Sequence, residues 1–258
     1  MSNPSVSQTE PPAITHIGPV QRVGLIGDVH AEDTRLETVL AFFDGERPKL
    51  DALLCTGDLA DGGGCVDRAC ELLRAHGVHT VRGNHDRWLL TDKVRHIAEA
   101  HRREQLQDST LAYLEALPLT VRFDTPMGPG MLCHGIDRHD MVKIWPGNSR
   151  MPPERSEHLD ALIEDGELAV LLNGHMHFRT LVHFEGLVLL NAGTLKPRHR
   201  PGFSIVDFAE RTATGYEFRG DYVEQVRTLS LVPEPHHRVW PNTAAFDGEW
   251  MPTTLYAN

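Results

Sequence analysis

Five short stretches of the sequence place glycine beside side chains that can bind a metal ion. In the last of them, Gly174-His175-Met176-His177, two histidines lie two residues apart, shortly after the apolar run 168–172. Neutral imidazole is the commonest nitrogen ligand of metal ions in proteins, so such a pair suits a metal site. The other four stretches have the same form: Gly27-Asp28-Val29-His30, Gly57-Asp58, Gly83-Asn84-His85-Asp86 and Cys133-His134-Gly135. The repeated pattern predicts a shared metal centre.

These stretches offer two carboxylates, one amide oxygen and four imidazoles as ligands. The seven residues are Asp28, His30, Asp58, Asn84, His134, His175 and His177. A mixed set of nitrogen and oxygen donors without a thiolate suits Mn, Fe, Zn, Co or Ni, of which we favour Mn or Fe. Seven ligands are too many for one catalytic ion with an open position. We therefore expect two divalent or trivalent ions that share one carboxylate.

Such a centre would attract phosphate. Two divalent ions carry +4, two aspartates carry −2 and a bridging hydroxide carries −1, which leaves the centre near +1 in a chain of formal net charge −11. Two metal ions roughly 3.5–4 Å apart can lower the pKa of a shared water, orient a phosphoryl group and stabilise the entering and leaving oxygens. We expect a small phosphorylated substrate, with nucleotides included, and no extended DNA or RNA, which needs clustered Lys and Arg.

Parallel strands would bring these residues together. Apolar runs predict strands at 23–26, 52–55 and 78–82, each followed by one of the glycine-bounded stretches, and apolar spacing predicts helices at 36–43 and 66–73 between them. Further strands are expected at 120–123, 131–133, 168–172, 187–190, 203–206 and as a pair within 215–230, with short helices after Ser109 and at 156–163. Side chains that follow the carboxyl ends of parallel strands converge on one crevice, so this order predicts an α/β fold with one shared site.

The composition is that of a soluble globular protein with one large domain or two small ones. Of 258 residues, 40% are hydrophobic and 24% are charged, and no apolar stretch is long enough for a membrane span. The first residues lack the basic and apolar regions of a signal peptide, so we expect a cytoplasmic protein without a membrane partner. The four cysteines show no recognisable zinc or disulfide spacing and are expected to be reduced.

Several segments are less regular. Residues 1–20 are rich in Ser, Pro and Thr and are expected to form a disordered lead before a single domain at 21–232. Residues 88–107 have helical propensity, and either a helical cap over the site or a solvated helix fits them. The irregular stretch 136–155 is a candidate substrate loop. The Pro-rich tail 233–258 fits either a packed tail or a contact in a homo-oligomer.

The glycine-bounded motifs at 27–30, 57–58, 83–86, 133–135 and 174–177 resemble, in the same order, those of the calcineurin-like metallophosphoesterase superfamily. Asn191-Ala192-Gly193-Thr194 is similar to a late Asn-x-Gly-Ser/Thr loop of that superfamily. The resemblance implies a four-layer αββα sandwich, with two mixed β-sheets flanked by helices. It also implies that Asp28, His30 and His177 hold the first metal, that Asn84, His134 and His175 hold the second, and that Asp58 bridges them.

The resemblance further implies roles for the two residues after Asn84. His85 would act as general acid or stabilise the developing charge, and Asp86 would orient it. The reaction would be the in-line attack of a metal-bridging hydroxide on phosphorus, without a covalent enzyme intermediate. Basic residues that could clamp the phosphate are Arg87, Arg138, Lys196, Arg198 and Arg200, although a solvated surface charge is the simpler account of each.

The substrate class stays open within that superfamily. Asp86 stands where protein-phosphatase-like relatives often carry Glu, which resembles the phosphodiesterase and general bacterial branches. After Gly57-Asp58, the sequence Leu59-Ala60-Asp61-Gly62 lacks the Asp-Arg-Gly continuation of protein phosphatases. We therefore favour hydrolysis of a small phosphodiester or nucleotide, with a phosphomonoesterase, protein phosphatases included, as the alternative. A third hypothesis is a non-catalytic scaffold of the same fold. Decayed ligands would mark such a scaffold, and here every ligand position is filled.

Overall fold

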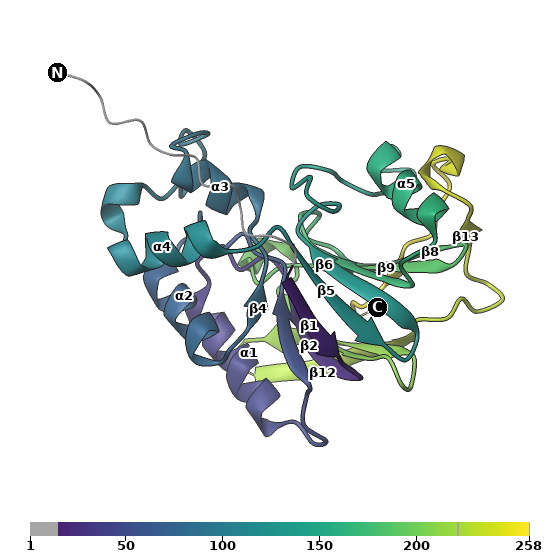
Figure 1. Ribbon diagram of the computed structural model, residues 1–258, viewed down its shortest axis with the longest axis horizontal. Helices are drawn as coiled ribbons and strands as arrows, with labels where there is room; N and C mark the ends of the chain where they lie inside the picture. Colours follow the sequence, from purple (N-terminus) through teal and green to yellow (C-terminus); the bar gives the residue numbers. More distant parts are fainter. Residues whose placement is uncertain (1–14, 221, 258) are drawn as a thin grey trace.

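Two β-sheets packed face to face form the centre of the molecule (Figure 1). The computed structural model describes residues 15–220 and 222–257. In the six-stranded sheet the order is β12 (Tyr222–Ser230), β11 (Thr212–Arg219), β10 (Gly202–Asp207), β2 (Arg22–Ile26), β3 (Ala52–Cys55) and β4 (His79–Thr80). In the eight-stranded sheet it is β1 (Thr15–Pro19), β5 (Thr120–Thr125), β6 (Gly128–Cys133), β7 (Val170–Asn173), β9 (Leu187–Ala192), β8 (Arg179–Phe184) and β13 (Val239–Trp240), with β14 (Thr253–Thr254) also beside β8.

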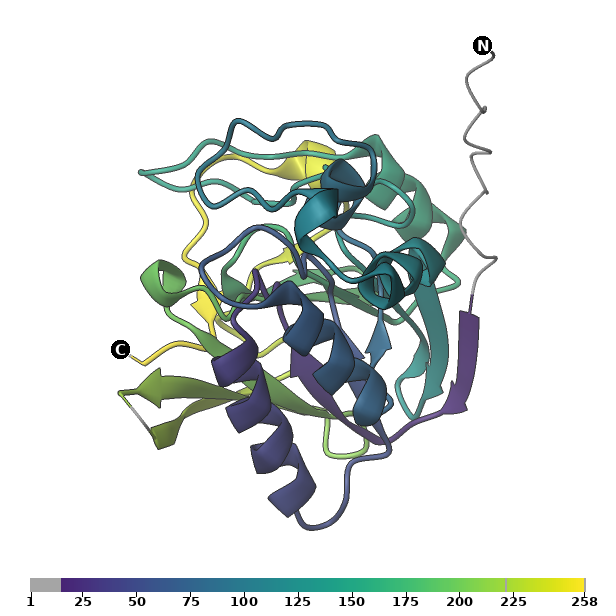
Figure 2. The same ribbon diagram turned by 90° about the vertical axis from the view of Figure 1, so that its left-hand side faces the viewer.

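Helices cover the outer sides of the two sheets (Figure 1). On the side of the six-stranded sheet lie α1 (Asp33–Gly45), α2 (Val66–Ala75), α3 (Asn84–Leu90) and α4 (Asp108–Ala116), and on the other side lies α5 (Glu157–Asp165). Short 3₁₀ turns are η1 (Arg103–Gln105), η2 (Pro197–His199) and η3 (Thr243–Ala245). Figure 2 looks onto the helical side, where α1 and α2 lie next to each other in front of the strands.

The strands of the central layers are apolar on both faces. In β7, Val170 and Leu172 enter the core between the sheets, whereas Leu171 enters the core beneath α5. Successive side chains of a strand point to opposite faces, so a strand covered on both sides reads as a continuous apolar run. A third core lies between the six-stranded sheet and the α1–α2 pair. The expected four-layer αββα sandwich of two mixed sheets is therefore confirmed.

The start of the described chain is more ordered than the sequence suggested. Residues 1–14 lie outside the described residues, but 15–19 form β1, which pairs in parallel with β5. Val20 is buried, and its N–H donates to the carbonyl of Asp124 at 2.8 Å. The prediction of a disordered lead is wrong for residues 15–20, because pairing with an edge strand uses backbone groups and needs no apolar pattern.

The prediction of a helix over residues 88–107 is wrong for most of that segment. α3 ends at Leu90, and residues 91–102 contain neither helix nor strand. Asp92, Val94 and Glu99 have positive φ angles of 52°, 55° and 60°. This left-handed conformation interrupts a right-handed helix. We refer to residues 91–102 as the strap.

The C-terminal segment packs against the eight-stranded sheet, so the packed-tail alternative describes it. β13 pairs in parallel with β8, and β14 pairs with the same strand in antiparallel fashion. Trp240 and Trp250 are buried in the core that contains α5. No helix among the described residues has the length and apolar character needed to cross a bilayer.

This packing predicts that the tail contributes to stability. Trp240 is 2% exposed, and its ring lies 5.0 Å from that of Phe246. Trp240→Ala should lower the free energy of unfolding by about 3–5 kcal/mol, because it leaves a large cavity in a packed core. Urea unfolding measures the change. The control is Met251→Ala in the same tail, where the side chain is 88% exposed and the change should be negligible. Equal effects of the two substitutions would contradict this prediction.

Candidate metal centre

The predicted ligands lie where strands of both sheets end. Asp28 and His30 follow β2, Asp58 follows β3, and Asn84 opens α3 just after β4. From the other sheet, His134 follows β6, and His175 and His177 follow β7. The pairs β2–β3, β3–β4 and β6–β7 are parallel, so these strands end on one side of the molecule. The structure thus brings all seven predicted ligands together from five loops.

The loops hold several ligands in a strained backbone conformation. The φ angles of His30, Asp58, His175 and His177 are 47°, 47°, 67° and 59°. Residues other than glycine rarely adopt this left-handed region, and such strain is concentrated at functional sites. Hydrogen bonds between loops hold the conformation: the N–H of His30 donates to the carbonyl of Asp58 at 2.7 Å, and that of Gly174 donates to His134 at 2.9 Å.

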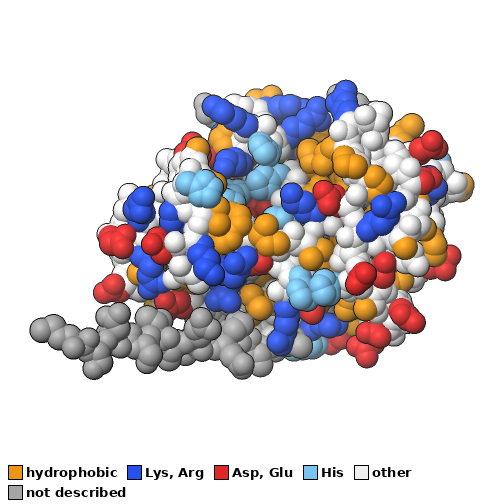
Figure 3. All heavy atoms as spheres, turned by 90° about the horizontal axis from the view of Figure 1, so that it is seen from above, with side chains coloured by type: hydrophobic (Ala, Val, Ile, Leu, Met, Phe, Trp, Pro, Cys, Tyr) orange, Lys and Arg blue, Asp and Glu red, His pale blue; other side chains and the backbone are white. Residues whose placement is uncertain are grey.

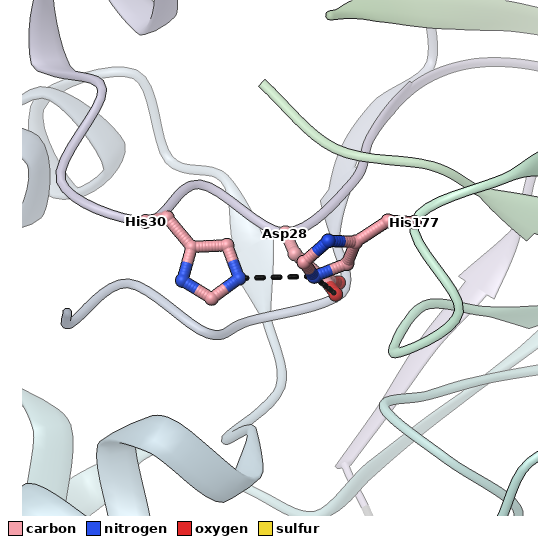
Figure 4. Close-up of side chains that lie close together, drawn as sticks. All are labelled: Asp28, His30 and His177. Atoms are coloured by element: carbon pink, nitrogen blue, oxygen red, sulfur yellow. Dashed lines mark hydrogen bonds and ion pairs between the residues drawn. The ribbon is translucent and has the colours of Figure 1, made fainter. Parts of the chain in front are cut away.

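One group of ligands is formed by Asp28, His30 and His177 (Figure 4). The Nε2 atoms of the two histidines are 3.0 Å apart, and Nε2 of His177 is 3.2 Å from Oδ2 of Asp28. Asp28 and His30 are buried, whereas His177 is half-buried. Two imidazole nitrogens and one carboxylate oxygen that face one another at these distances suit a cation.

A second group consists of Asp58, His134 and His175. Nε2 of His134 lies 3.3 Å from Oδ2 of Asp58 and 2.9 Å from Oδ1 of Asn84. Nε2 of His175 is buried and has no hydrogen-bond partner. The same Oδ2 of Asp58 is 3.9 Å from Nε2 of His30, so this carboxylate faces both groups.

Three of the four candidate ligand histidines have a contact at Nδ1. Nδ1–H of His30 donates to the carbonyl of Asp61 at 3.0 Å, and that of His134 donates to the carbonyl of Thr56 at 2.8 Å. Nδ1 of His177 lies 3.0 Å from Nδ1 of His199. A carbonyl acceptor at Nδ1 selects the tautomer whose Nε2 can bind a metal ion once the imidazole is neutral. This pattern, together with the unpartnered Nε2 of His175, fits the donor set to metal ions.

The charged groups of the site shift one another's pKa values. Burial lowers the pKa values of His30 and His175 to about 4, so both are neutral near pH 7. Burial would also lower the pKa of His134, but the charges of Asp58 and Asp28 raise it to about 10. Burial would raise the pKa values of these two aspartates, and the nearby His134 lowers both. The proton on His134 therefore supplies positive charge that a bound cation would supply instead.

His85 lies beside the ligands and is held by Asp61. The His85 and His30 rings are 4.8 Å apart, and Nδ1 of His85 is 2.7 Å from Oδ2 of Asp61. Burial would lower the pKa of His85, but this hydrogen bond and the charges of Asp58 and Asp61 raise it. Burial likewise opposes ionisation of Asp61, but hydrogen bonds from His85 and Arg95 lower its pKa. Asp61 follows the ligand Asp58 by three residues, and that spacing is the signal that sequence reasoning missed.

The expected role of Asp86 as the partner of His85 is wrong. Its Oδ1 accepts the N–H groups of Leu59 and Ala60 at 2.8 and 3.1 Å, and its Oδ2 accepts that of Gly83 at 3.0 Å. Asp86 occupies the third position of α3, so its side chain folds back onto the start of the helix. The Asp86 carboxylate therefore holds the backbone at residues 59–60 and at Gly83, and the His85 ring makes its hydrogen bond to Asp61 instead.

The candidate phosphate clamps differ in their surroundings. Arg87 makes two hydrogen bonds to the Asp140 carboxylate, of 2.6 and 2.9 Å. Arg138 and Arg198 are exposed, and Lys196 is half-buried. Their role toward substrate stays a prediction. His199, to which the sequence analysis gave no role, contacts the ligand His177.

Comparisons with known proteins identify the family and agree with the fold. The family model described as calcineurin-like phosphoesterase matches residues 21–190. An uncharacterised protein of Methanocaldococcus jannaschii is 24% identical over 180 residues, which are 67% of this chain and 69% of that protein. A metallophosphoesterase from Sphaerobacter thermophilus is similar at a TM-score of 0.57 and 24% identity, over 78% of this chain and 89% of that chain. A hypothetical protein from Pyrococcus horikoshii is similar at a TM-score of 0.61 and 13% identity, over 80% and 89% of the chains.

The coupled charges predict that metal binding releases a proton. At pH 7.5 His134 is protonated, because its pKa of about 10 lies above that pH, whereas His30 and His175, with values of about 4, are not. Loading the metal-free protein with Zn²⁺ should therefore release about one proton more from wild type than from His134→Gln. Titration calorimetry in buffers of different ionisation enthalpy measures this difference. The excess should fall to about half of a proton near pH 10, where half of His134 has already lost its proton. Equal proton release at pH 7.5 would contradict the prediction.

Proposed function

The chain belongs to the calcineurin-like phosphoesterase family, and we propose that it is a metal-dependent enzyme that hydrolyses a small phosphodiester or nucleotide. One observation carries the proposal. Seven nitrogen and oxygen donors converge from five loops, with the Nε2 of His175 buried and unpartnered among them. Such a set is costly to bury without a cation. The same observation argues against a scaffold that has lost its ligands.

Two metal ions would complete the site. Asp28, His30 and His177 would hold one ion, Asn84, His134 and His175 would hold the other, and Asp58 would lie between them. Bound ions of this kind supply an acidified water and positive charge for the phosphoryl oxygens. Manganese or iron suits the mixed donor set. Figure 3 shows histidines at the surface of this end of the molecule with Lys and Arg side chains around them, which suits an anionic substrate.

In this proposal His85 supplies the proton that the leaving oxygen needs. Asp61 occupies Nδ1 of His85, so Nε2 is the ring nitrogen left to exchange a proton with the leaving oxygen. The raised pKa of His85 increases the fraction of imidazolium near pH 7, which favours a general acid. Asp61 stabilises that imidazolium and fixes the orientation of the ring.

The preference for a diester over a monoester rests on sequence features. Asp86 and the absence of an Asp-Arg-Gly continuation after Asp58 resemble phosphodiesterase branches of the superfamily. A screen with added Mn²⁺ against cyclic nucleotides, dinucleotides, phosphomonoesters and phosphopeptides tests this preference. Hydrolysis of diesters or nucleotides supports it, whereas a clear preference for monoesters or phosphopeptides would favour the alternative, a phosphomonoesterase.

The role of His85 can be tested directly. His85→Ala should lower kcat for bis-p-nitrophenyl phosphate with Mn²⁺ by about 10²–10⁴-fold, because it removes the general acid and no proposed metal ligand. Steady-state hydrolysis measures the change. His16→Ala is the control, because this imidazole is 53% exposed on β1. Full activity of His85→Ala would rule out the proposed role.

A further inference from the structure

The strap contributes one buried arginine to the site. The Arg95 side chain is only 6% exposed, and every nitrogen of its guanidinium donates a hydrogen bond. Nη1 and Nη2 donate to Oδ1 and Oδ2 of Asp61 at 2.8 and 2.9 Å. Nε donates to the carbonyl of Lys93 at 2.8 Å, and Nη1 also donates to that of His101 at 2.7 Å. Arg95 therefore connects two parts of the strap with each other and connects the strap with Asp61.

Asp61 is the link between the strap and His85. Its carboxylate is 1% exposed and accepts four hydrogen bonds. Oδ2 accepts from Nδ1 of His85 and from Arg95, and Oδ1 accepts from Arg95 and from the N–H of His101 at 2.9 Å. A carboxylate has about four acceptor positions, so this one is fully occupied. Its plane is set by the arginine fork, and that plane decides where Oδ2 meets the imidazole.

We propose that Arg95 is a positioning residue for His85 and acts through the carboxylate of Asp61. The inference deepens the proposed function and rests on it for its kinetic consequences. Without the Arg95 guanidinium, the buried Asp61 carboxylate loses two of its four hydrogen bonds. A carboxylate in that condition turns toward water or another donor, and the His85 ring turns with it.

The neighbouring Arg103 separates this role from simple support of the strap. Arg103 donates to the carbonyl of Leu90 at 2.7 Å and lies 3.4 Å from Glu115, so it also ties down this part of the chain. It makes no hydrogen bond to Asp61. Arg103→Gln is therefore the matched control for Arg95→Gln, because both lose an arginine that anchors the same region.

The first test is kinetic. With Mn²⁺ and bis-p-nitrophenyl phosphate, Arg95→Gln should lower kcat about 10- to 100-fold with KM nearly unchanged, since a misplaced acid affects the chemical step more than binding. Arg95→Lys restores the charge without the fork and should recover only part of kcat. Asp61→Asn should lower kcat too, and adding Arg95→Gln to it should cost little more, because both act through one contact. Arg103→Gln should keep wild-type kcat.

The second test does not depend on turnover. In Zn²⁺-loaded protein, the Nδ1–H of His85 bonded to Asp61 should give a downfield proton resonance that is absent from His85→Ala. Arg95→Gln should shift or broaden this resonance, whereas Arg103→Gln should leave it unchanged. Thermal unfolding of each variant checks that it is folded.

The outcomes separate the two proposals. Wild-type kcat and an unchanged resonance in Arg95→Gln would overturn the positioning role and leave the phosphoesterase proposal intact. Equal losses of kcat in Arg95→Gln and Arg103→Gln would also overturn it, because they would show support of the strap alone. If wild type hydrolyses no phosphoester, the proposed function fails, and the resonance still decides whether Arg95 positions His85. If Arg95→Gln does not fold, the Arg95→Lys protein carries both tests.

Discussion

Asp28 joins the ends of the two sheets, and the geometry of the site depends on its contacts. Its Oδ1 accepts the hydroxyl of Thr56 at 2.8 Å, its Oδ2 accepts the N–H of His175 at 2.9 Å, and its carbonyl accepts the N–H of Leu195 at 2.9 Å. One aspartate thus connects the loops after β2, β3, β7 and β9. The approach is so close that a Cβ on Gly174 would lie 2.2 Å from Oδ1, so glycine is required there. Asp28, which connects these loops of the two sheets, is therefore also a predicted metal ligand.

The seven candidate ligands could be grouped from the sequence because each follows a short apolar run and lies within three residues of a glycine. Strand ends converge in an α/β fold, so residues far apart in the chain can be predicted to share one site. Their role as metal ligands stays a prediction. The strand β8 was missed for the opposite reason, since Arg179, Thr180 and His183 interrupt its apolar pattern although all are buried. The Arg179 guanidinium gains one partner from the other sheet, because its Nη2 lies 3.1 Å from Oε1 of Glu217 on β11, and the local sequence pattern does not show this contact.

The partners of the ligands were harder to predict than the ligands. Asp86 stands next to His85 in the sequence, but the start of α3 turns its carboxylate onto backbone N–H groups, and Asp61 takes the imidazole instead. The strap and the C-terminal tail contribute in the same way, through contacts between distant segments. Tyr256 accepts the N–H of Arg179 at 2.8 Å and donates to the carbonyl of His177 at 3.2 Å. The contacts of the strap and of the tail depend on how distant loops pack in three dimensions, which the spacing of residues along the chain does not encode.

The central claim is that two cations occupy the space between these ligands. Crystals of protein supplied with Mn²⁺, measured for anomalous scattering and matched by metal analysis of the same preparation, test it most directly. The account predicts two ions per chain, one beside Asp28, His30 and His177 and one beside Asn84, His134 and His175, with Asp58 in contact with both. Protein that takes up no metal, or a single ion that leaves either group empty, would contradict it.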